Sequence, residues 1–593
     1  MERITWLRNE MKKARIDCYF LPTGDHHGSE YVCAAFKGRE FLSGFTGSAG
    51  ILIVTEKEAG LWTDGRYFTQ AEKELLGKAI KLYRMGEPKV PTIFEYLTKT
   101  LKDGETLAFD GRLLSIQTGR KIAKIQEDKN IKINFEADLL AGIWRERPSL
   151  PMNPIWELGI DWCGQSTADK LKKVRDKINK ENADALIINS LDDIMWLFNI
   201  RGSDIPDNPV ALSYAYVAED KTYLFVQTEA LSEELGVKFA NLDIEIVDYH
   251  SFYTRLNDLA ITPKQKIILD QEKCNFHIYK IIEQKANPIL SKSPTVILKA
   301  IKNEAELRHL NNVYKKDSAA VIRFIKWLKE NDQQVTEMEA ASKIDQLRRE
   351  TEGFIDLSFG TIAAYGANAA MMHYQATEDS NTVIEKEGLF LIDSGGQYFG
   401  GTTDVTRTIV MGDVSNDVKR YFTAVVRGML NLSNLTFLYG CTGRNLDIAA
   451  RMPLWELRSD YKCGTGHGIG YMLSVHEGPQ NIRMPYREDC QEAVIEPGMI
   501  ISNEPGVYKA GEYGIRIENI MAVKKVAENE DGKFLAFEPL TFVPIDLAAL
   551  DVTRMSAEDR LRLNEYHQSV YENMCDYLSE DELIWLKEAT KFV

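Results

Sequence analysis

Short apolar runs bounded by Gly and Asp recur through the first half of the chain, a pattern that predicts β-strands. The first series contains the apolar run Asp17-Cys-Tyr-Phe-Leu, the expected turn Phe41-Leu-Ser-Gly-Phe-Thr-Gly-Ser and the apolar run Ile51-Leu-Ile-Val-Thr. The second contains, in the same order, the run Asp184-Ala-Leu-Ile-Ile, the expected turn Trp196-Leu-Phe-Asn-Ile-Arg-Gly-Ser and the run Tyr214-Ala-Tyr-Val. Helical patterns lie between these runs, so the segment before Pro294 is predicted to contain two copies of one α/β unit.

The second half begins with helical spacing of apolar residues at 297–328. From about Glu387 the pattern changes to strands, predicted at 389–392, 408–411, 499–502 and 515–520. After Val543 the pattern is again helical. Two capping pairs, Ser556 with Asp559 and Ser579 with Glu582, mark the expected starts of two tail helices.

Two proline-bearing stretches are the predicted domain boundaries. Pro148, Pro151 and Pro154 fall within seven residues, and Pro288 and Pro294 lie near the end of the second repeat. Proline removes a backbone donor and fixes φ, so such spacing interrupts helices and central strands. We therefore expect two α/β domains at 1–150 and 151–298, an α+β domain at 299–545 and a helical extension at 546–593.

The charge balance excludes several kinds of partner. The chain has 593 residues, with 72 basic and 88 acidic side chains and a net charge of −16. Such a surface repels nucleic acid and anionic membranes, so we expect neither as a partner. No apolar run has the length of a membrane span, and the amino-terminal segment has no signal-peptide core. The eight cysteines are scattered without a Cys-x-x-Cys pair, which suits a reducing compartment, and the cytoplasm is the expected location.

Five positions in the second half place carboxylates or an imidazole where folding alone would not choose them. Asp393 ends an apolar run, and Asp404 begins the next strand after the turn-like segment Gly-Gly-Gln-Tyr-Phe-Gly-Gly, so paired strands would bring both acids together. His467 lies among glycines that permit other groups to approach closely. Glu504 follows an apolar run, and Glu518 lies inside one.

Each of these positions also has an ordinary structural explanation. An Asp after a strand is commonly a turn residue or a helix cap, and a single His is usually a core residue. Glu518 needs a cation, however, because an unpaired carboxylate among isoleucines is costly to bury. Arg516, two positions away on the same strand face, is one candidate partner. As a set, the four acids and one imidazole suit two hard or borderline divalent ions, with Mn²⁺ the foremost choice.

Taken together, these motifs resemble the M24 peptidase family, which has the pita-bread fold of methionine aminopeptidase, prolidase and aminopeptidase P. The similarity is greatest to the large three-domain Xaa-Pro aminopeptidases, and it covers nearly the whole chain. It includes Arg39-Glu-Phe-Leu-Ser-Gly-Phe-Thr-Gly-Ser-Ala-Gly, Leu61-Trp-Thr-Asp-Gly-Arg-Tyr-Phe, Leu197-Phe-Asn-Ile-Arg-Gly-Ser-Asp-Ile-Pro and Val475-His-Glu-Gly-Pro. The resemblance implies two creatinase-like N-terminal domains, a pita-bread catalytic domain and a homodimer. It also implies release of the N-terminal residue from peptides whose second residue is proline.

The resemblance further implies a role for each ligand. Asp393 would bind one metal ion, Asp404 and Glu518 would bridge both ions, and His467 and Glu504 would complete the second.

Residues around the metal ions acquire expected roles in the same way. His373 would contact the substrate, His476 would stabilise the reacting carbonyl, and Glu504 would also transfer protons. The family usually has His-Gly-Thr-Gly-His-Gly where this chain has Cys463-Gly-Thr-Gly-His-Gly. Because the first His of that motif lines the substrate pocket, Cys463 is expected to change substrate affinity, pH profile or specificity and to leave the metal site intact. Arg516 is expected beside the ligands or the pocket.

Two alternatives stay open. A prolidase would use the same metal centre on Xaa-Pro dipeptides, and the sequence does not reveal substrate length. A non-catalytic binding protein could keep the fold, but such relatives lose metal ligands, whereas this chain retains all five expected ligands. The replacement at Cys463 keeps this alternative open.

Overall fold

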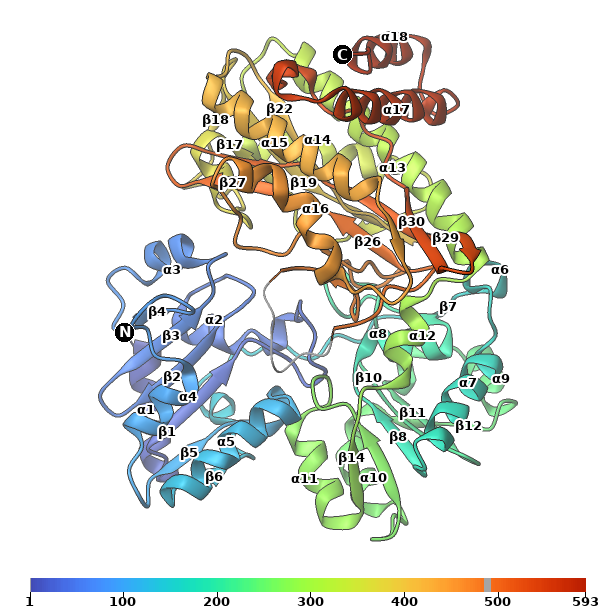
Figure 1. Cartoon of the computed structure of the whole chain (residues 1–593). Coiled ribbons are helices and arrows are strands. Elements are labelled where there is room, and N and C mark those ends of the chain that lie inside the picture. Colours follow the sequence, from blue (N-terminus) through green and yellow to red (C-terminus); the bar gives the residue numbers. More distant parts are fainter. Residues whose placement is uncertain (1, 485–491) are drawn as a thin grey trace. The chain divides into compact units, whose positions relative to one another are not determined.

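The computed structural model describes residues 2–484 and 492–593, and the chain forms two compact units (Figure 1). Unit 1 comprises Met1–Gly159 and Gln165–Val296, and unit 2 comprises Ile160–Gly164 and Ile297–Val593. The finer division of the chain at residues 150, 298 and 545 stays a prediction. Cys490, one of the scattered cysteines, lies outside the described residues.

Unit 1 contains two six-stranded sheets with the same strand order, β4-β3-β2-β1-β5-β6 and β12-β11-β10-β8-β13-β14. In both sheets the central strand, β1 or β8, pairs antiparallel with one neighbour and parallel with the other. The prediction of a repeated α/β unit is therefore confirmed. The strands are β1 (Cys18–Pro22), β2 (Ile51–Thr55), β3 (Ala59–Thr63), β4 (Lys81–Arg84), β5 (Thr106–Ala108), β6 (Lys132–Asn134), β8 (Ala185–Ile188), β10 (Ser213–Ala218), β11 (Thr222–Val226), β12 (Ile244–Asp248), β13 (Lys266–Leu269) and β14 (Asn287–Leu290).

Amphipathic helices accompany these sheets. In α1 (Glu2–Ala14), the buried residues Ile4, Leu7 and Met11 follow helical spacing along one face. Pro288 does not interrupt a strand as expected, because it lies in β14, an edge strand that tolerates a missing donor. The other main helices of the unit are α2 (Gly38–Ser43), α3 (Phe68–Leu75), α4 (Ile93–Thr100), α5 (Ile116–Lys129), α7 (Thr167–Lys180), α8 (Leu191–Phe198), α9 (Glu233–Ala240), α10 (Phe252–Asp258) and α11 (Phe276–Lys285).

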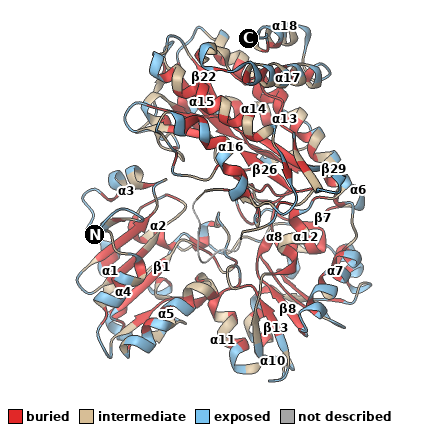
Figure 2. Cartoon of the chain, viewed as in Figure 1, coloured by how far each residue is buried: buried red, intermediate tan, exposed pale blue. Residues whose placement is uncertain are grey.

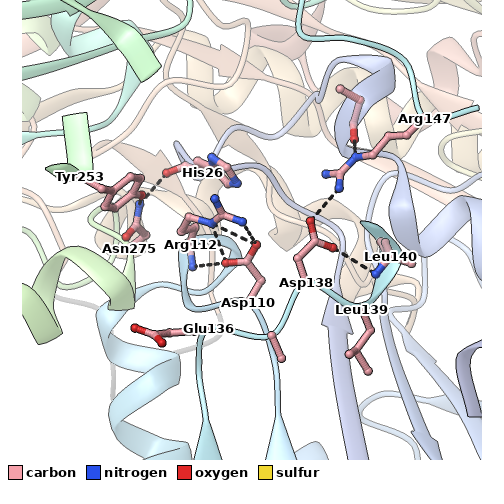
Figure 3. A network of polar contacts seen from close by, with 12 residues as sticks. His26, Asp110, Arg112, Glu136, Asp138, Leu139, Leu140, Arg147, Tyr253 and Asn275 are labelled. Carbon is pink, nitrogen blue, oxygen red and sulfur yellow. Dashed lines mark hydrogen bonds and ion pairs between the residues drawn. The ribbon is translucent and has the colours of Figure 1, made fainter. Parts of the chain in front are cut away.

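A polar network links the segments that carry the two sheets of unit 1 (Figure 3). Asn275, the N-cap of α11, donates from Nδ2 to the carbonyl oxygen of His26 at 2.9 Å and to the Tyr253 hydroxyl at 3.0 Å. Beside it, Arg112 donates to the two oxygens of Asp110 at 2.9 and 2.7 Å. Asn275 and His26 are 249 positions apart, so the network is a long-range link within the unit.

Unit 2 is an α+β structure with several small sheets. Its predicted strands at 389–392, 408–411 and 499–502 correspond to β19, β22 and β26, except that Met411 and Met499 lie just outside the observed strands. The predicted strand at 515–520 is wrong because it is split at Ile517 and Glu518. One sheet consists of β17 (Ile362–Tyr365), β19 (Leu389–Ser394) and β22 (Val405–Val410). A second consists of β23 (Thr436–Leu438), β30 (Gly532–Pro539), β29 (Asn519–Asn529) and β26 (Ile500–Asn503). A separate hairpin pairs β27 (Gly506–Lys509) with β28 (Tyr513–Arg516).

The helices of unit 2 begin at clear capping signals. The helical pattern at 297–328 is divided at Asn303, whose side chain accepts hydrogen bonds from the first turn of the following helix. The tail helices start at the capping boxes predicted at Ser556 and Ser579. The helices are α6 (Ile160–Cys163), α12 (Pro294–Ala300), α13 (Glu304–Glu330), α14 (Glu337–Arg349), α15 (Asn416–Ser433), α16 (Gly443–Glu456), α17 (Ala557–Met574) and α18 (Glu580–Ala589).

The core of unit 2 lies between its sheets and helices, where the strands are largely buried and the outer helix faces are exposed (Figure 2). Phe324 of α13 and Ile344 of α14 pack in one cluster with Phe390 and Ile392 of β19. This packing anchors the strand that carries Asp393. Within residues 2–484 and 492–593, every helix is too short or too polar to span a bilayer.

Candidate metal centre

Two antiparallel strands position the first pair of acids. Asp393 in β19 lies opposite Thr406 in β22, and Asp404 immediately precedes β22. Both acidic residues are buried. The strand pairing predicted from the turn-like segment is therefore confirmed.

Glu518 reaches this region from the break between β28 and β29. Its backbone nitrogen donates to the carbonyl oxygen of Thr406 at 3.0 Å, and its own carbonyl oxygen accepts from Arg407 Nη1 at 2.6 Å. The Thr406 hydroxyl donates to Glu518 Oε2 at 2.9 Å. Contacts with β22 thus fix both the backbone and the carboxylate of Glu518.

The prediction that Arg516 could neutralise Glu518 is wrong. Arg516 Nη2 instead donates to Asp393 Oδ2 at 2.6 Å, and its Nη1 donates to the Tyr508 hydroxyl at 2.8 Å. β28 ends at Arg516, so the alternation of strand faces does not continue to Glu518.

His467 faces two carboxylates. Its Nε2 lies 3.5 Å from Asp404 Oδ2 and 3.5 Å from Glu504 Oε1, while its Nδ1 lies 3.0 Å from the carbonyl oxygen of Gly468. A carbonyl oxygen only accepts, so Nδ1 donates and Nε2 is the ring nitrogen that faces the acids. Asp404, His467 and Glu518 each offer a ligand atom within 4.8 Å of the others.

The buried carboxylates of this site lie close enough together to raise one another's pKa values, so bound cations would stabilise their charged forms. Burial raises the pKa of Asp404 well above its ordinary value, and the charges of Asp393 and Glu504 raise it further. Burial and Asp404 likewise raise the pKa of Glu518, and burial raises that of Glu504 although His467 opposes the shift. Asp393 Oδ1 and Glu518 Oε1 are buried without a hydrogen-bond partner among the described residues. Orphaned carboxylate oxygens beside one imidazole fit divalent cations well.

The residues expected to bind substrate lie near these acids. The His476 ring meets the His467 ring edge to face, with centroids 4.4 Å apart. His373 follows Met372, whose carbonyl oxygen accepts a hydrogen bond from Arg516. Burial, with the nearby Glu504 charge, raises the pKa of Cys463 to about 12, so this thiol is neutral at physiological pH.

Arg407 is a site residue that the sequence did not reveal. It is 2% exposed and donates to the carbonyl oxygen of Glu518 and to Asn519 Oδ1. An arginine in a strand usually projects to solvent, and nothing local in Thr-Arg-Thr marks this one as buried. The only available signal was its place three residues after Asp404.

A cluster of buried carboxylates and one imidazole is typical of metal-dependent enzymes, and comparison with known proteins identifies the family. Residues 308–525 match the family model described as Metallopeptidase family M24, and residues 533–593 match the C-terminal region of peptidase_M24. Residues 3–134 and 146–306 match two models described as Creatinase/Prolidase N-terminal domain.

Whole-chain relatives agree with these matches. The chain is 36% identical over 603 residues to a probable Xaa-Pro aminopeptidase P of Botryotinia fuckeliana, covering 99% of this chain and 92% of the relative. It is 36% identical over 617 residues to Xaa-Pro aminopeptidase 1 of Dictyostelium discoideum, and the match covers 100% of this chain and 96% of the relative. The chain belongs to metallopeptidase family M24. The predicted fold class, two creatinase-like domains followed by a pita-bread metallopeptidase domain, is confirmed.

Solved structures extend the comparison. An X-prolyl aminopeptidase of Caenorhabditis elegans, described as a cytosolic enzyme with a di-nuclear active site, matches with a TM-score of 0.95 and 35% identity, covering 100% of this chain and 99% of that chain. A Xaa-Pro dipeptidase of Bacillus anthracis, 24% identical with a TM-score of 0.52, covers 64% of this chain and 99% of that chain and shares the fold.

Proposed function

We propose that Asp393, Asp404, His467, Glu504 and Glu518 hold two divalent metal ions. The orphaned oxygens of Asp393 and Glu518 carry this proposal, because buried carboxylate oxygens without donors are unfavourable unless a cation is bound. In the arrangement that the family resemblance implies, Asp393 would help to hold one ion, Asp404 and Glu518 would be shared by both, and His467 and Glu504 would help to hold the second. Mn²⁺ suits a set of four carboxylates and one imidazole.

The proposed activity is release of the N-terminal residue from peptides whose second residue is proline. The bond to proline has no N–H and a fixed ring, so it needs a site that does not depend on an ordinary extended backbone. When bound, the two ions supply Lewis acidity that favours deprotonation of the attacking water.

The chain's own residues perform the remaining steps. Glu504 accepts the proton of the water and later delivers it to the departing proline nitrogen. His476, packed against His467, donates to the oxygen on which negative charge develops. His373 holds the substrate backbone. Cys463 borders the pocket as a neutral thiol, and Arg516 orients Asp393.

A prolidase acting only on Xaa-Pro dipeptides is the alternative activity, and a non-catalytic binding protein is the alternative class. The whole-chain match to Xaa-Pro aminopeptidases at 36% identity favours the aminopeptidase. The five ligand residues disfavour a purely non-catalytic role.

We infer a homodimer that acts in the cytoplasm on small peptides, without nucleic-acid or membrane partners. The net charge of −16 supports the two exclusions, and the cytosolic description of the Caenorhabditis relative supports the location. The domains proposed for this enzyme are 1–150, 151–298, 299–545 and 546–593. Support for the dimer comes from an exposed apolar stripe on α16, formed by Ile448, Met452 and Trp455.

A substrate panel tests the activity. Metal-stripped protein is incubated with an Xaa-Pro-Xaa tripeptide, its Xaa-Ala-Xaa analogue and an Xaa-Pro dipeptide, with and without Mn²⁺. The expected result is Mn²⁺-dependent release of the first residue from the proline tripeptide alone. Cleavage of the dipeptide alone would identify a prolidase. Metal binding without any cleavage would favour the non-catalytic alternative, with Asp404→Asn as the matched variant that should lose metal.

A further inference from the structure

The loop that carries His476 is held by a buried ionic cluster. Its next residue, Glu477, is 4% exposed and accepts a hydrogen bond from Lys299 Nζ at 2.6 Å on Oε2. Lys302 Nζ donates to the other oxygen of the same carboxylate and also to the Lys299 carbonyl oxygen at 3.1 Å. The side chains of Lys302 and Lys299 are 0% and 7% exposed. Both lysines belong to the segment that opens unit 2.

Simple packing does not account for this cluster. Two buried ammonium groups face one buried carboxylate, and removing three charged groups from water is costly. Apolar side chains of similar volume would hold a loop at lower cost. A carboxylate with both oxygens bound by lysines, however, restricts the position of its own backbone more than an apolar contact would.

The backbone of Glu477 leads directly to the metal ligand His467. The Glu477 nitrogen donates to the carbonyl oxygen of Gly468 at 2.8 Å, and the same oxygen lies 3.0 Å from His467 Nδ1. A Cβ on Gly468 would lie 2.0 Å from the Glu477 carbonyl oxygen, so the two segments approach as closely as glycine allows. The Gly468 carbonyl is therefore shared by the clamped loop and by the ring whose orientation it sets.

We propose that Glu477, clamped by Lys299 and Lys302, is a positioning residue that orients His467 through the Gly468 carbonyl and places His476 against it. This inference rests on the proposed function for its catalytic consequence, whereas its effect on metal affinity does not. Outer partners of ligating histidines fix tautomer and ring orientation, and their loss typically lowers metal affinity or activity about 10–100-fold.

Lys302→Met is the primary test, because removing one of the two lysines leaves a balanced Lys299–Glu477 pair, and such a variant is expected to fold. Glu477→Gln is the second variant. Lys329→Met, which breaks the pair with Asp546 in the same unit, is the matched control. Each metal-stripped protein is titrated with Mn²⁺ by calorimetry, kcat and KM on the proline tripeptide are measured at saturating Mn²⁺, and melting of the metal-free protein is followed.

Lys302→Met is expected to weaken Mn²⁺ binding about tenfold or more and to lower kcat with little change in KM, while the control changes neither. A merely structural role would lower the melting temperature of the variant and leave affinity and kcat unchanged, which would overturn the proposal. If the wild-type protein cleaves no peptide, the proposed function fails, yet the Mn²⁺ titration still decides the positioning role. If Glu477→Gln does not fold, Lys302→Met alone decides.

Discussion

Arg516 binds Asp393 through a 2.6 Å contact between Nη2 and Oδ2, with the two side chains 4% and 13% exposed. The guanidinium occupies one carboxylate oxygen and leaves Oδ1 of Asp393 without a hydrogen-bond partner in the described part of the chain. Arg516 therefore orients the carboxylate so that its other oxygen is available to the proposed metal ion.

Arg516→Lys is expected to weaken Mn²⁺ binding about 10–100-fold, the usual cost of losing an outer partner of a metal ligand. A lysine offers no planar fork, so it would not keep the contacts with both Asp393 and Tyr508. Calorimetric titration of metal-stripped protein measures the change. Arg427→Lys, which alters a partly exposed pair with Glu456 and Asp559 in the same unit, should leave the affinity unchanged. Equal affinities for all three proteins would contradict this role of Arg516.

Acid should destabilise unit 2 through His567. Burial, together with the charge of Arg407, lowers the pKa of His567 to about 4 from 6.5. Between pH 4 and 6.5 the folded state thus binds fewer protons at His567 than the unfolded state does. The contribution of the neutral ring to the free energy of unfolding is therefore complete above pH 6.5 and is lost as the pH falls toward 4. Between pH 7.5 and 5 the expected loss is about 2 kcal/mol.

The matched variant is His567→Gln, which retains an acceptor for the Ile545 backbone nitrogen but has no titrating ring. Urea unfolding of both metal-stripped proteins at pH 7.5 and 5 gives the comparison. The wild-type free energy of unfolding should fall more than that of the variant by about 2 kcal/mol. Identical losses in the two proteins would show that His567 is not the titrating group.

The local sequence pattern was sufficient to predict features that depend on residues close together in the chain. Asp393 could be placed at the end of β19 because an apolar run stops there, and its pairing with β22 followed from the turn-like segment between them. The repeated unit before Pro294 could be predicted for the same reason, since both copies contain an apolar run, an aromatic-Leu-x-x-x-x-Gly-Ser segment and another apolar run in the same order.

Long-range partners could not be predicted from pattern. The break at Ile517 and Glu518 ends the strand alternation, so Arg516 meets Asp393 instead of Glu518. The segment Ile160–Gly164 belongs to unit 2 although its flanking residues belong to unit 1. A hydrogen bond of 2.9 Å from the Tyr471 hydroxyl to the Trp162 carbonyl oxygen joins it there. That contact spans 309 positions, which no local periodicity encodes.

Cys463→His should introduce a pH-dependent step that the wild-type enzyme lacks. The wild-type thiol has a pKa of about 12, raised by burial and by Glu504, and so it does not titrate between pH 5 and 9. An imidazole at this position would titrate near neutrality and add a hydrogen-bond donor to the pocket. The profile of kcat/KM against pH for the proline tripeptide should gain an ionisation between about pH 5 and 8.

The same substitution should leave Mn²⁺ affinity unchanged, because it alters none of the five proposed metal ligands. Cys441→His, at a half-buried cysteine elsewhere in unit 2, is the control and should reproduce the wild-type profile. A variant profile indistinguishable from that of the wild type would place Cys463 outside the substrate pocket.

Trp455→Glu should convert the proposed homodimer into a monomer. Ile448, Met452 and Trp455 follow helical spacing on α16 and are 48%, 48% and 39% exposed, so they form an apolar stripe on one face of the helix. Exposed apolar stripes of this kind are typical of protein–protein contacts, and aromatic side chains commonly contribute most of the binding energy. A carboxylate buried in such a contact would be unpaired and strongly unfavourable.

Light scattering after size-exclusion chromatography measures the molar mass of the Trp455→Glu variant. Ile584→Glu on α18, at a position 69% exposed, is the control that should remain dimeric. A wild-type protein that is monomeric, or a Trp455→Glu variant that remains dimeric, would exclude this face as the dimer contact.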